Sequence, residues 1–257
     1  MSNIQLKLDF LKRILLDGVT PDIANAFFST KAFPDDSLML REVALPLDYN
    51  RTEGSDWPSR AHTMIGLKRL NNLNRCLDIV RANNISGDFI ETGVWRGGAC
   101  IFMQMYCRLY NLNRRVFVAD SFQGMPVPAG NPSDVNNPHH IYNHVLAISK
   151  AEVESNFKAY NALDSNVIFL EGWFKDTLPN NPYINKLSLL RLDGDMYLST
   201  SNVLNSLWDK LETGGAIIID DYALEGCRNA LHDFRNYRGI TTEIRIIDRG
   251  GAYWVKE

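Results

Sequence analysis

The stretch DFIETGVWRGGAC, residues 88–100, joins an apolar run, a glycine-rich turn and the start of a second apolar segment. We interpret it as a buried strand, a tight turn at Gly93 and a helix that begins near Gly97 and Gly98. Glycine tolerates the backbone angles of such turns and lets a ligand approach the backbone closely. Nucleotide, flavin and adenosyl cofactors all use a turn of this kind, so it predicts a cofactor without naming one.

The same alternation of strand and helix continues along the chain. Further strands are predicted at 115–120, 166–172, 187–193 and 215–220, with helices at about 97–111, 149–162, 199–211 and 224–238. Strands separated by helices of about 10 to 15 residues indicate βαβ units and a parallel α/β sheet. The last residues, TTEIRIID-RGG-AYWVKE, predict an antiparallel β-hairpin. A Rossmann-like sheet that is parallel and ends in an antiparallel hairpin is typical of class I methyltransferases.

Two regions fall outside this alternation. Residues 1–85 are predicted to form a helical N-terminal extension with a loop-rich interruption, and residues 86–257 the cofactor-binding domain. The extension opens with an amphipathic helix that we expect to pack on the body or on a partner subunit rather than on a membrane. Residues 124–146, rich in Pro, Asn, Gly and His, form a long connection at the edge where ligands bind, as expected of a lid.

The composition excludes several classes of protein. The 257 residues carry a net charge of −3, which argues against a nucleic-acid binder, since these usually show a basic surface. No apolar run reaches the length of about 18 to 20 residues that spans a bilayer, and we expect no membrane partner. The four cysteines form no CxxC pair, which favours buried thiols in a reducing, cytoplasmic location.

Two carboxylates beside the glycine turn narrow the choice of cofactor. Glu91 directly precedes the turn, where its charge would repel a pyrophosphate but suits the ammonium and sulfonium groups of S-adenosylmethionine. Asp120 ends the next strand and is placed to accept hydrogen bonds from a ribose diol. The simpler alternative for Asp120 is a helix cap. Taken together, the two acids favour S-adenosylmethionine binding.

Further acids end two apolar strands. Asp193 follows LSLLRL, and Asp220 and Asp221 follow GAIII. If these strands are neighbours, three carboxylates converge, and a divalent cation such as Mg²⁺ would relieve their repulsion. Asp193 would then be both a ligand and the general base. The alternative is that Asp221 caps the next helix and Asp220 binds backbone, while Asp195 in DGD is either part of the site or only a turn residue.

Six motifs in order give the chain a family resemblance. They are AHTMIGLKRLNNL, ETGVWRGGACIF, VADSFQGMP, GWFKDTLP, LRLDGDMY and IIDDY, and together they resemble the macrocin-type (TylF-type) O-methyltransferases over residues 60–257. These enzymes use S-adenosylmethionine and Mg²⁺ to methylate sugar hydroxyls in antibiotic biosynthesis. The resemblance implies a homodimer, a glycoside substrate, metal ligands Asp193, Asp220 and Asp221, and cofactor contacts from Thr63, Met64, Glu91, Gly93, Asp120, Ser121, Gly172 and Trp173.

Other functions remain open on the residues alone. A catechol, another vicinal diol or a polysaccharide sugar could also present two oxygens to a metal. A nicotinamide-dependent oxidoreductase is disfavoured by Glu91 and by the lack of a clear Tyr-xxx-Lys pair, and a non-catalytic binding protein by the intact acids. His139, His140 and His144 in the long connection could bind a transition metal, but solvated or substrate-facing roles are favoured.

Overall fold

The computed structural model describes residues 3–18, 24–29, 38–43, 51–128, 130–135 and 139–257. The chain divides into two compact units, Met1–Asn72 and Leu73–Glu257, which are described separately below. Within the described residues, every helix is too short or too polar to cross a bilayer.

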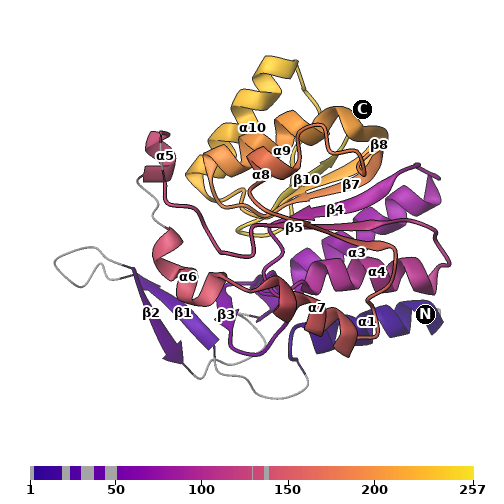
Figure 1. The fold of residues 1–257 in the computed structure, drawn as a ribbon, viewed down its shortest axis with the longest axis horizontal. Coiled ribbons are helices and arrows are strands. Elements are labelled where there is room, and N and C mark those ends of the chain that lie inside the picture. Colours follow the sequence, from indigo (N-terminus) through magenta and orange to yellow (C-terminus); the bar gives the residue numbers. More distant parts are fainter. Residues whose placement is uncertain (1–2, 19–23, 30–37, 44–50, 129, 136–138) are drawn as a thin grey trace. The chain divides into compact units, whose positions relative to one another are not determined.

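The larger unit is built on a seven-stranded sheet in the order β6-β5-β4-β7-β8-β10-β9 (Figure 1). The strands are β4 (Asp88–Thr92), β5 (Val116–Asp120), β6 (Val167–Glu171), β7 (Leu187–Leu192), β8 (Leu211–Ile219), β9 (Arg245–Ile246) and β10 (Ala252–Val255). The first five pair in parallel, and β10 pairs antiparallel with both β8 and β9. The predicted α/β sheet with a C-terminal antiparallel hairpin is therefore confirmed.

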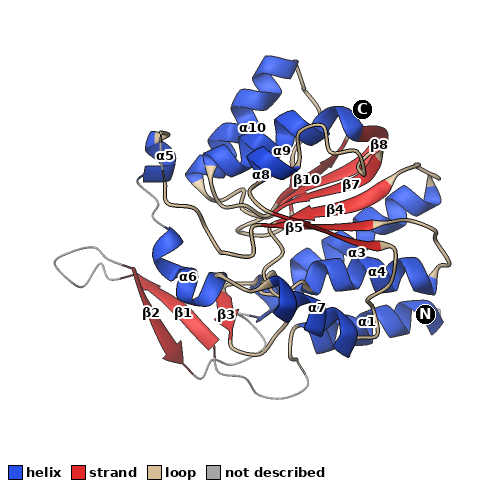
Figure 2. Ribbon diagram, viewed as in Figure 1, coloured by secondary structure: helices blue, strands red, loops and turns tan. Residues whose placement is uncertain are grey.

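Helices cover the sheet on both faces (Figure 2). The longer ones are α3 (Gly66–Ala82), which spans the division between the units, α4 (Gly98–Leu109), α7 (Lys150–Ala159), α9 (Tyr197–Leu207) and α10 (Glu225–Arg238). Helices α9 and α10 pack on one face, where their apolar side chains join those of the central strands in one core. Every residue of β7 is buried, as expected for a parallel strand covered on both sides.

Short elements complete the larger unit. They are α5 (Pro132–Val135), the 3₁₀ turn η1 (His139–Tyr142), α6 (Asn143–Leu146), α8 (Phe174–Thr177) and the 3₁₀ turn η2 (Trp208–Lys210). Three of them, α5, η1 and α6, belong to the long connection 124–146. The C-terminal hairpin turns at Asp248, whose Oδ1 accepts hydrogen bonds from the backbone N–H groups of Gly250 and Gly251, both at 2.8 Å.

The smaller unit begins with helix α1 (Asn3–Leu15), which confirms the predicted amphipathic helix. Its predicted apolar face includes Leu8, Leu11 and Leu15, all buried, and Ile4, which is half-buried. Arg51 and Asp56 form a buried ion pair in the same unit, with 3.0 Å between Arg51 Nε and Asp56 Oδ2.

The rest of the smaller unit differs from the expected helical extension. Strands β1 (Ala24–Ser29), β2 (Leu38–Val43) and β3 (Asp56–Pro58) form an antiparallel sheet in the order β2-β1-β3. Each strand is short, and β3 pairs with β1 across more than twenty intervening residues, so no local pattern of the sequence indicates the pairing. The unit ends at Asn72 within α3, and the boundary expected near residue 85 falls after the end of that helix.

Candidate active site

The glycine turn brings the ends of three neighbouring strands into contact. Gly93 has a φ of +88°, and a Cβ atom at this position would lie only 1.6 Å from the carbonyl oxygen of Asp193 at the end of β7. The backbone N–H of Gly93 donates to the carbonyl of Ala119 on β5 at 2.8 Å, and that of Asp193 donates to Thr92 on β4 at 2.9 Å. Glycine is therefore required at position 93 for both its conformation and its lack of a side chain.

The strand order places several predicted residues at this same edge. Strands β5, β4, β7 and β8 are consecutive and parallel, so their carboxyl ends lie side by side. Ligands bind in open α/β sheets outside these ends. Glu91 lies on β4, Asp120 ends β5, Asp193 follows β7, and Asp220 follows β8. Strands β7 and β8 are therefore neighbours, which is the condition that the sequence analysis set for Asp193 and Asp220 to converge.

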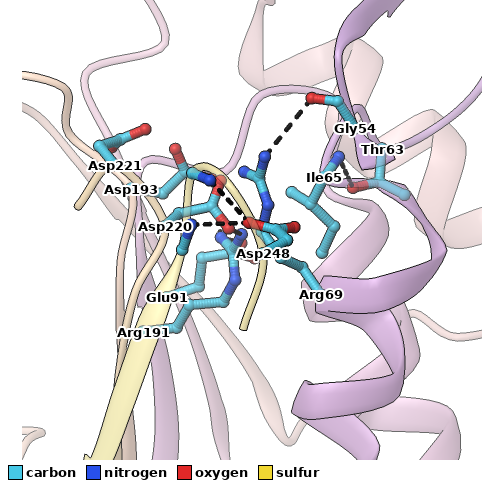
Figure 3. Close-up of polar contacts among 12 residues, drawn as sticks. Gly54, Thr63, Ile65, Arg69, Glu91, Arg191, Asp193, Asp220, Asp221 and Asp248 are labelled. Carbon is cyan, nitrogen blue, oxygen red and sulfur yellow. Dashed lines mark hydrogen bonds and ion pairs between the residues drawn. The ribbon is translucent and has the colours of Figure 1, made fainter. Parts of the chain in front are cut away.

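Arg191 lies between three of these acids, Glu91, Asp193 and Asp220, and was missed by the sequence analysis (Figure 3). Its side chain is fully buried, and one terminal nitrogen donates to Asp193 Oδ2 at 2.7 Å and also to Glu91. The other terminal nitrogen donates to Asp220. The available signal was an arginine within the otherwise apolar strand LSLLRL, since a buried charge of this kind requires partners.

The electrostatics of this group follow from burial and pairing. Burial opposes the charge of Arg191, but the carboxylates of Asp220, Glu91 and Asp193 outweigh it and raise the pKa of Arg191 well above its ordinary value. Burial also raises the pKa of Glu91, against the opposing attraction of Arg191. Glu91 is only 2% exposed, and its second oxygen is in contact with Cys100 Sγ at 2.8 Å. Glu91 therefore serves first as a partner of Arg191.

A second group of acids lies beside Arg191 and is partly open to solvent. Carboxylate oxygens of Asp193, Asp195 and Asp221 all lie within 4.8 Å of one another. Burial and the charge of Asp220 raise the pKa of Asp193, and burial and the charge of Asp195 raise that of Asp221. Three carboxylates of like charge so close together fit a hard divalent cation such as Mg²⁺, which would relieve their repulsion.

The cluster differs from the expected metal-ligand set by one member. Asp195 has a φ of +57°, and its backbone N–H donates to Asp221 Oδ2 at 2.9 Å, so the DGD turn directs Asp195 into the cluster. Asp220 is 4% exposed and is directed toward Arg191 rather than toward Asp221 (Figure 3). The side chains of the adjacent residues Asp220 and Asp221 leave the end of β8 in different directions.

Asp120 and Ser121 shape the turns around them. The two carboxylate oxygens of Asp120 accept hydrogen bonds from the backbone N–H groups of Val94, at 2.7 Å, and Phe122, at 2.8 Å. Ser121 Oγ donates to the carbonyl of Gly124 at 3.0 Å and accepts from Gln123 N. Asp120 thus binds backbone N–H groups, much as the capping alternative expected, and in doing so it supports the glycine turn. Its contact with a cofactor stays a prediction.

The remaining predicted cofactor residues lie in two places. Gly172 follows β6, and its N–H donates to the carbonyl of Asp120 at 2.9 Å, which puts it and the half-buried Trp173 at the same sheet edge. Thr63 and Met64 belong to the smaller unit, just before α3. Thr63 is buried there, and its Oγ1 accepts a 3.4 Å hydrogen bond from the N–H of Ile65 (Figure 3).

The histidines of the long connection do not gather around a common point. Among the described residues, the group of potential metal ligands consists of aspartates and includes none of His139, His140 and His144. Burial lowers the pKa of His139, while His144 is exposed. A transition-metal site at these histidines therefore gains no support.

The chain is similar to known proteins over nearly its whole length. Residues 5–256 match the model of the family described as macrocin-O-methyltransferase (TylF). The chain is 44% identical to an 8-demethyl-8-(2,3-dimethoxy-alpha-L-rhamnosyl)-tetracenomycin-C 4'-O-methyltransferase of Streptomyces olivaceus, over 97% of this chain and 92% of the relative. It is 45% identical to a demethyldecarbamoylnovobiocin O-methyltransferase of Streptomyces niveus, over 98% and 94%.

A solved structure extends the similarity to the whole fold. The O-methyltransferase NovP superimposes with a TM-score of 0.88 and 42% sequence identity, over 99% of each chain. The family match spans both units, including the strands β1–β3 that the sequence analysis did not anticipate. By the match over nearly its whole length and by its identity to these relatives, the chain belongs to the macrocin-O-methyltransferase (TylF) family and is an O-methyltransferase.

Proposed function

We propose that this protein transfers a methyl group from S-adenosylmethionine to a sugar hydroxyl of a glycosylated natural product, in an antibiotic-type pathway. The observation that carries the proposal is the group of acids beside the glycine turn at the carboxyl edge of the sheet. The Streptomyces olivaceus relative is named for a substrate that carries a rhamnosyl group, which supports a sugar as the acceptor.

The methyl donor is assigned to the edge formed by β4, β5 and β6. Gly93, Asp120, Ser121, Gly172 and Trp173 lie along this edge. Thr63 and Met64, which belong to the smaller unit, stay predictions from the family resemblance. Glu91 discriminates against a pyrophosphate less than its sequence position suggests, because Arg191 balances its charge. Membership of a methyltransferase family, rather than Glu91 alone, supports S-adenosylmethionine.

Asp193, Asp220 and Asp221 are the proposed ligands of Mg²⁺. When bound, the ion would lower the pKa of an acceptor hydroxyl and hold it in place. Arg191 contacts Asp193 and Asp220, and the backbone of Asp195 contacts Asp221. Ligating carboxylates are commonly held by such outer partners, which fix their direction. The contact of Asp220 with Arg191 is therefore compatible with a ligand role.

Asp193 is the proposed general base. Its carboxylate would take the proton of the acceptor hydroxyl, whose oxygen forms the new bond to the methyl carbon while the carbon–sulfur bond of the donor breaks. S-adenosylhomocysteine is the other product. The close approach of Gly93 to Asp193 supports this role, because it places the proposed base directly beside the glycine turn to which the methyl donor is assigned.

Calorimetry with S-adenosylhomocysteine, with NAD⁺ as the control ligand, tests the donor. We expect binding of the first and not of the second. Asp193→Asn should retain this binding and lose methyl transfer by about a hundredfold or more, because it removes the base. Transfer is then measured on a glycoside, its aglycone and a catechol. Methylation of the catechol alone, or NAD⁺ binding, would overturn the proposal.

A pair of matched variants tests the ligand set. Asp220→Asn should weaken Mg²⁺ binding about tenfold or more, whereas Asp195→Asn should weaken it less, because Asp195 is a neighbour of the ligands in this proposal. Both variants remove one charge from the same edge, so each controls for the other. A larger loss in Asp195→Asn would replace Asp220 by Asp195 in the ligand set.

A further inference from the structure

Helix α9 obtains the cap of its N-terminus from a distant part of the chain. The residue at its own N-cap position, Met196, makes no side-chain hydrogen bond to the helix. Instead Asp134, 63 residues earlier in the sequence, accepts from the N–H of Tyr197 at 2.6 Å through Oδ1 and from that of Leu198 at 3.2 Å through Oδ2. A carboxylate satisfies these two donors and also interacts favourably with the helix dipole.

The surroundings of Asp134 are built to hold it. The residue is 1% exposed although it lies in the long connection 124–146. Gly226, at the start of α10, leaves the space it needs, because a Cβ atom there would lie 2.9 Å from Asp134 Oδ1. Asn229 of α10 donates to Ser133 Oγ at 3.4 Å. The short helix α5 is thus packed against both α9 and α10 (Figure 1).

The capped end of α9 is continuous with the acid cluster. Asp193 and Asp195 lie in the tight turn that joins β7 to α9, and this turn closes with a 2.6 Å hydrogen bond from Met196 N to the carbonyl of Gly194. One end of the turn is held by β4 and β7 through the N–H of Asp193. The other end is the first turn of α9, which Asp134 holds.

We infer that Asp134 is a positioning residue for the acid cluster. By holding the start of α9, it fixes the far end of the turn that carries Asp193 and Asp195, and it links the connection 124–146 to that turn. It takes no part in the chemistry itself. The inference rests on the proposed function only in treating these acids as the site of methyl transfer.

Hydrogen exchange of the metal-free protein tests the contact directly. In Asp134→Ala, peptides covering the turn 193–196 and the start of α9 should exchange about fivefold faster, the effect of losing a helix cap of about 1 kcal/mol. Asp134→Asn should give a smaller change, because its amide oxygen can still accept one of the two bonds. Tyr197→Phe is the control, since it removes the hydrogen bonds of the Tyr197 hydroxyl, to Asp233 at 2.9 Å and to Ser201, and leaves the backbone N–H that Asp134 caps.

Mg²⁺ affinity and kinetics test the consequence. Asp134→Ala should weaken Mg²⁺ binding and lower kcat about tenfold, as for other outer-shell partners, with the KM for S-adenosylmethionine unchanged. Faster exchange confined to α9, with the turn, Mg²⁺ affinity and kcat as in the Tyr197→Phe control, would reduce Asp134 to a helix cap and overturn the inference. If the wild-type enzyme transfers no methyl group, the proposed function fails, while the exchange of the turn still decides the role of Asp134.

Discussion

Arg191 is the residue that makes the buried part of the site stable. It is fully buried, and its two terminal nitrogens contact carboxylates of Glu91, Asp193 and Asp220. Burying such charges is costly unless they are paired, and breaking a buried pair leaves the partner uncompensated. Arg191 therefore allows several acids to gather at one sheet edge.

Replacing Arg191 by Met should lower the free energy of unfolding by about 3–5 kcal/mol at neutral pH, because Glu91 and Asp220 lose their counter-charge. Chemical denaturation measures this change. Arg238→Met is the matched control: Arg238 also pairs with an aspartate, Asp209, but at the surface. Loss of a surface pair should cost about 1 kcal/mol or less. Equal losses in the two variants would contradict the role of Arg191.

The loss of free energy of unfolding in Arg191→Met should become smaller as the pH is lowered from about 8 to about 5.5. Without Arg191, burial would raise the pKa of Glu91 further above its unfolded value than in the wild type. The folded state then binds more protons than the unfolded state, so stability rises as the pH falls through the folded pKa. Denaturation at both pH values, with Glu91→Gln added to the variant, checks the assignment, since the added change should flatten this dependence.

At the scale of secondary-structure elements, the site depends on how closely β4 approaches β7. The turn after β4 can touch the end of β7 only because residue 93 lacks a side chain. The same contact sets the distance between the proposed donor edge and Asp193. A substitution that disturbs this contact should therefore change cofactor binding as well as the free energy of unfolding.

Gly93→Ala tests this contact, because the added Cβ would lie 1.6 Å from the Asp193 carbonyl oxygen and force the strand ends apart. Gly239→Ala is the control: Gly239 also has a positive φ, +64°, but no atom lies within 4 Å of its added Cβ. The control should lose about 1–2 kcal/mol of stability from backbone strain alone. Gly93→Ala should lose more and also fail to bind S-adenosylhomocysteine in calorimetry. Normal binding by that variant would show that the approach of β4 to β7 is not needed by the donor.

At the scale of the whole molecule, the chain consists of a seven-stranded α/β unit and a smaller N-terminal unit with its own three-stranded sheet. Each strand of the smaller sheet has six residues or fewer, and the pairing of these strands is not visible in local periodicity. The larger unit, by contrast, repeats one local pattern of strand and helix. The homodimer implied by the family resemblance stays a prediction at this scale.

The sequence by itself determined the parallel sheet, its antiparallel end, the glycine turn and the acids that end β7 and β8. These features follow from hydrophobic periodicity and turn residues, which act over a few neighbouring positions. Only the tertiary structure decided that Arg191 holds Glu91 and Asp220, that Asp195 joins Asp193 and Asp221, and that Asp134 caps α9. Such contacts join residues up to 100 positions apart, and they depend on the direction in which each side chain leaves its strand or turn, which periodicity does not specify.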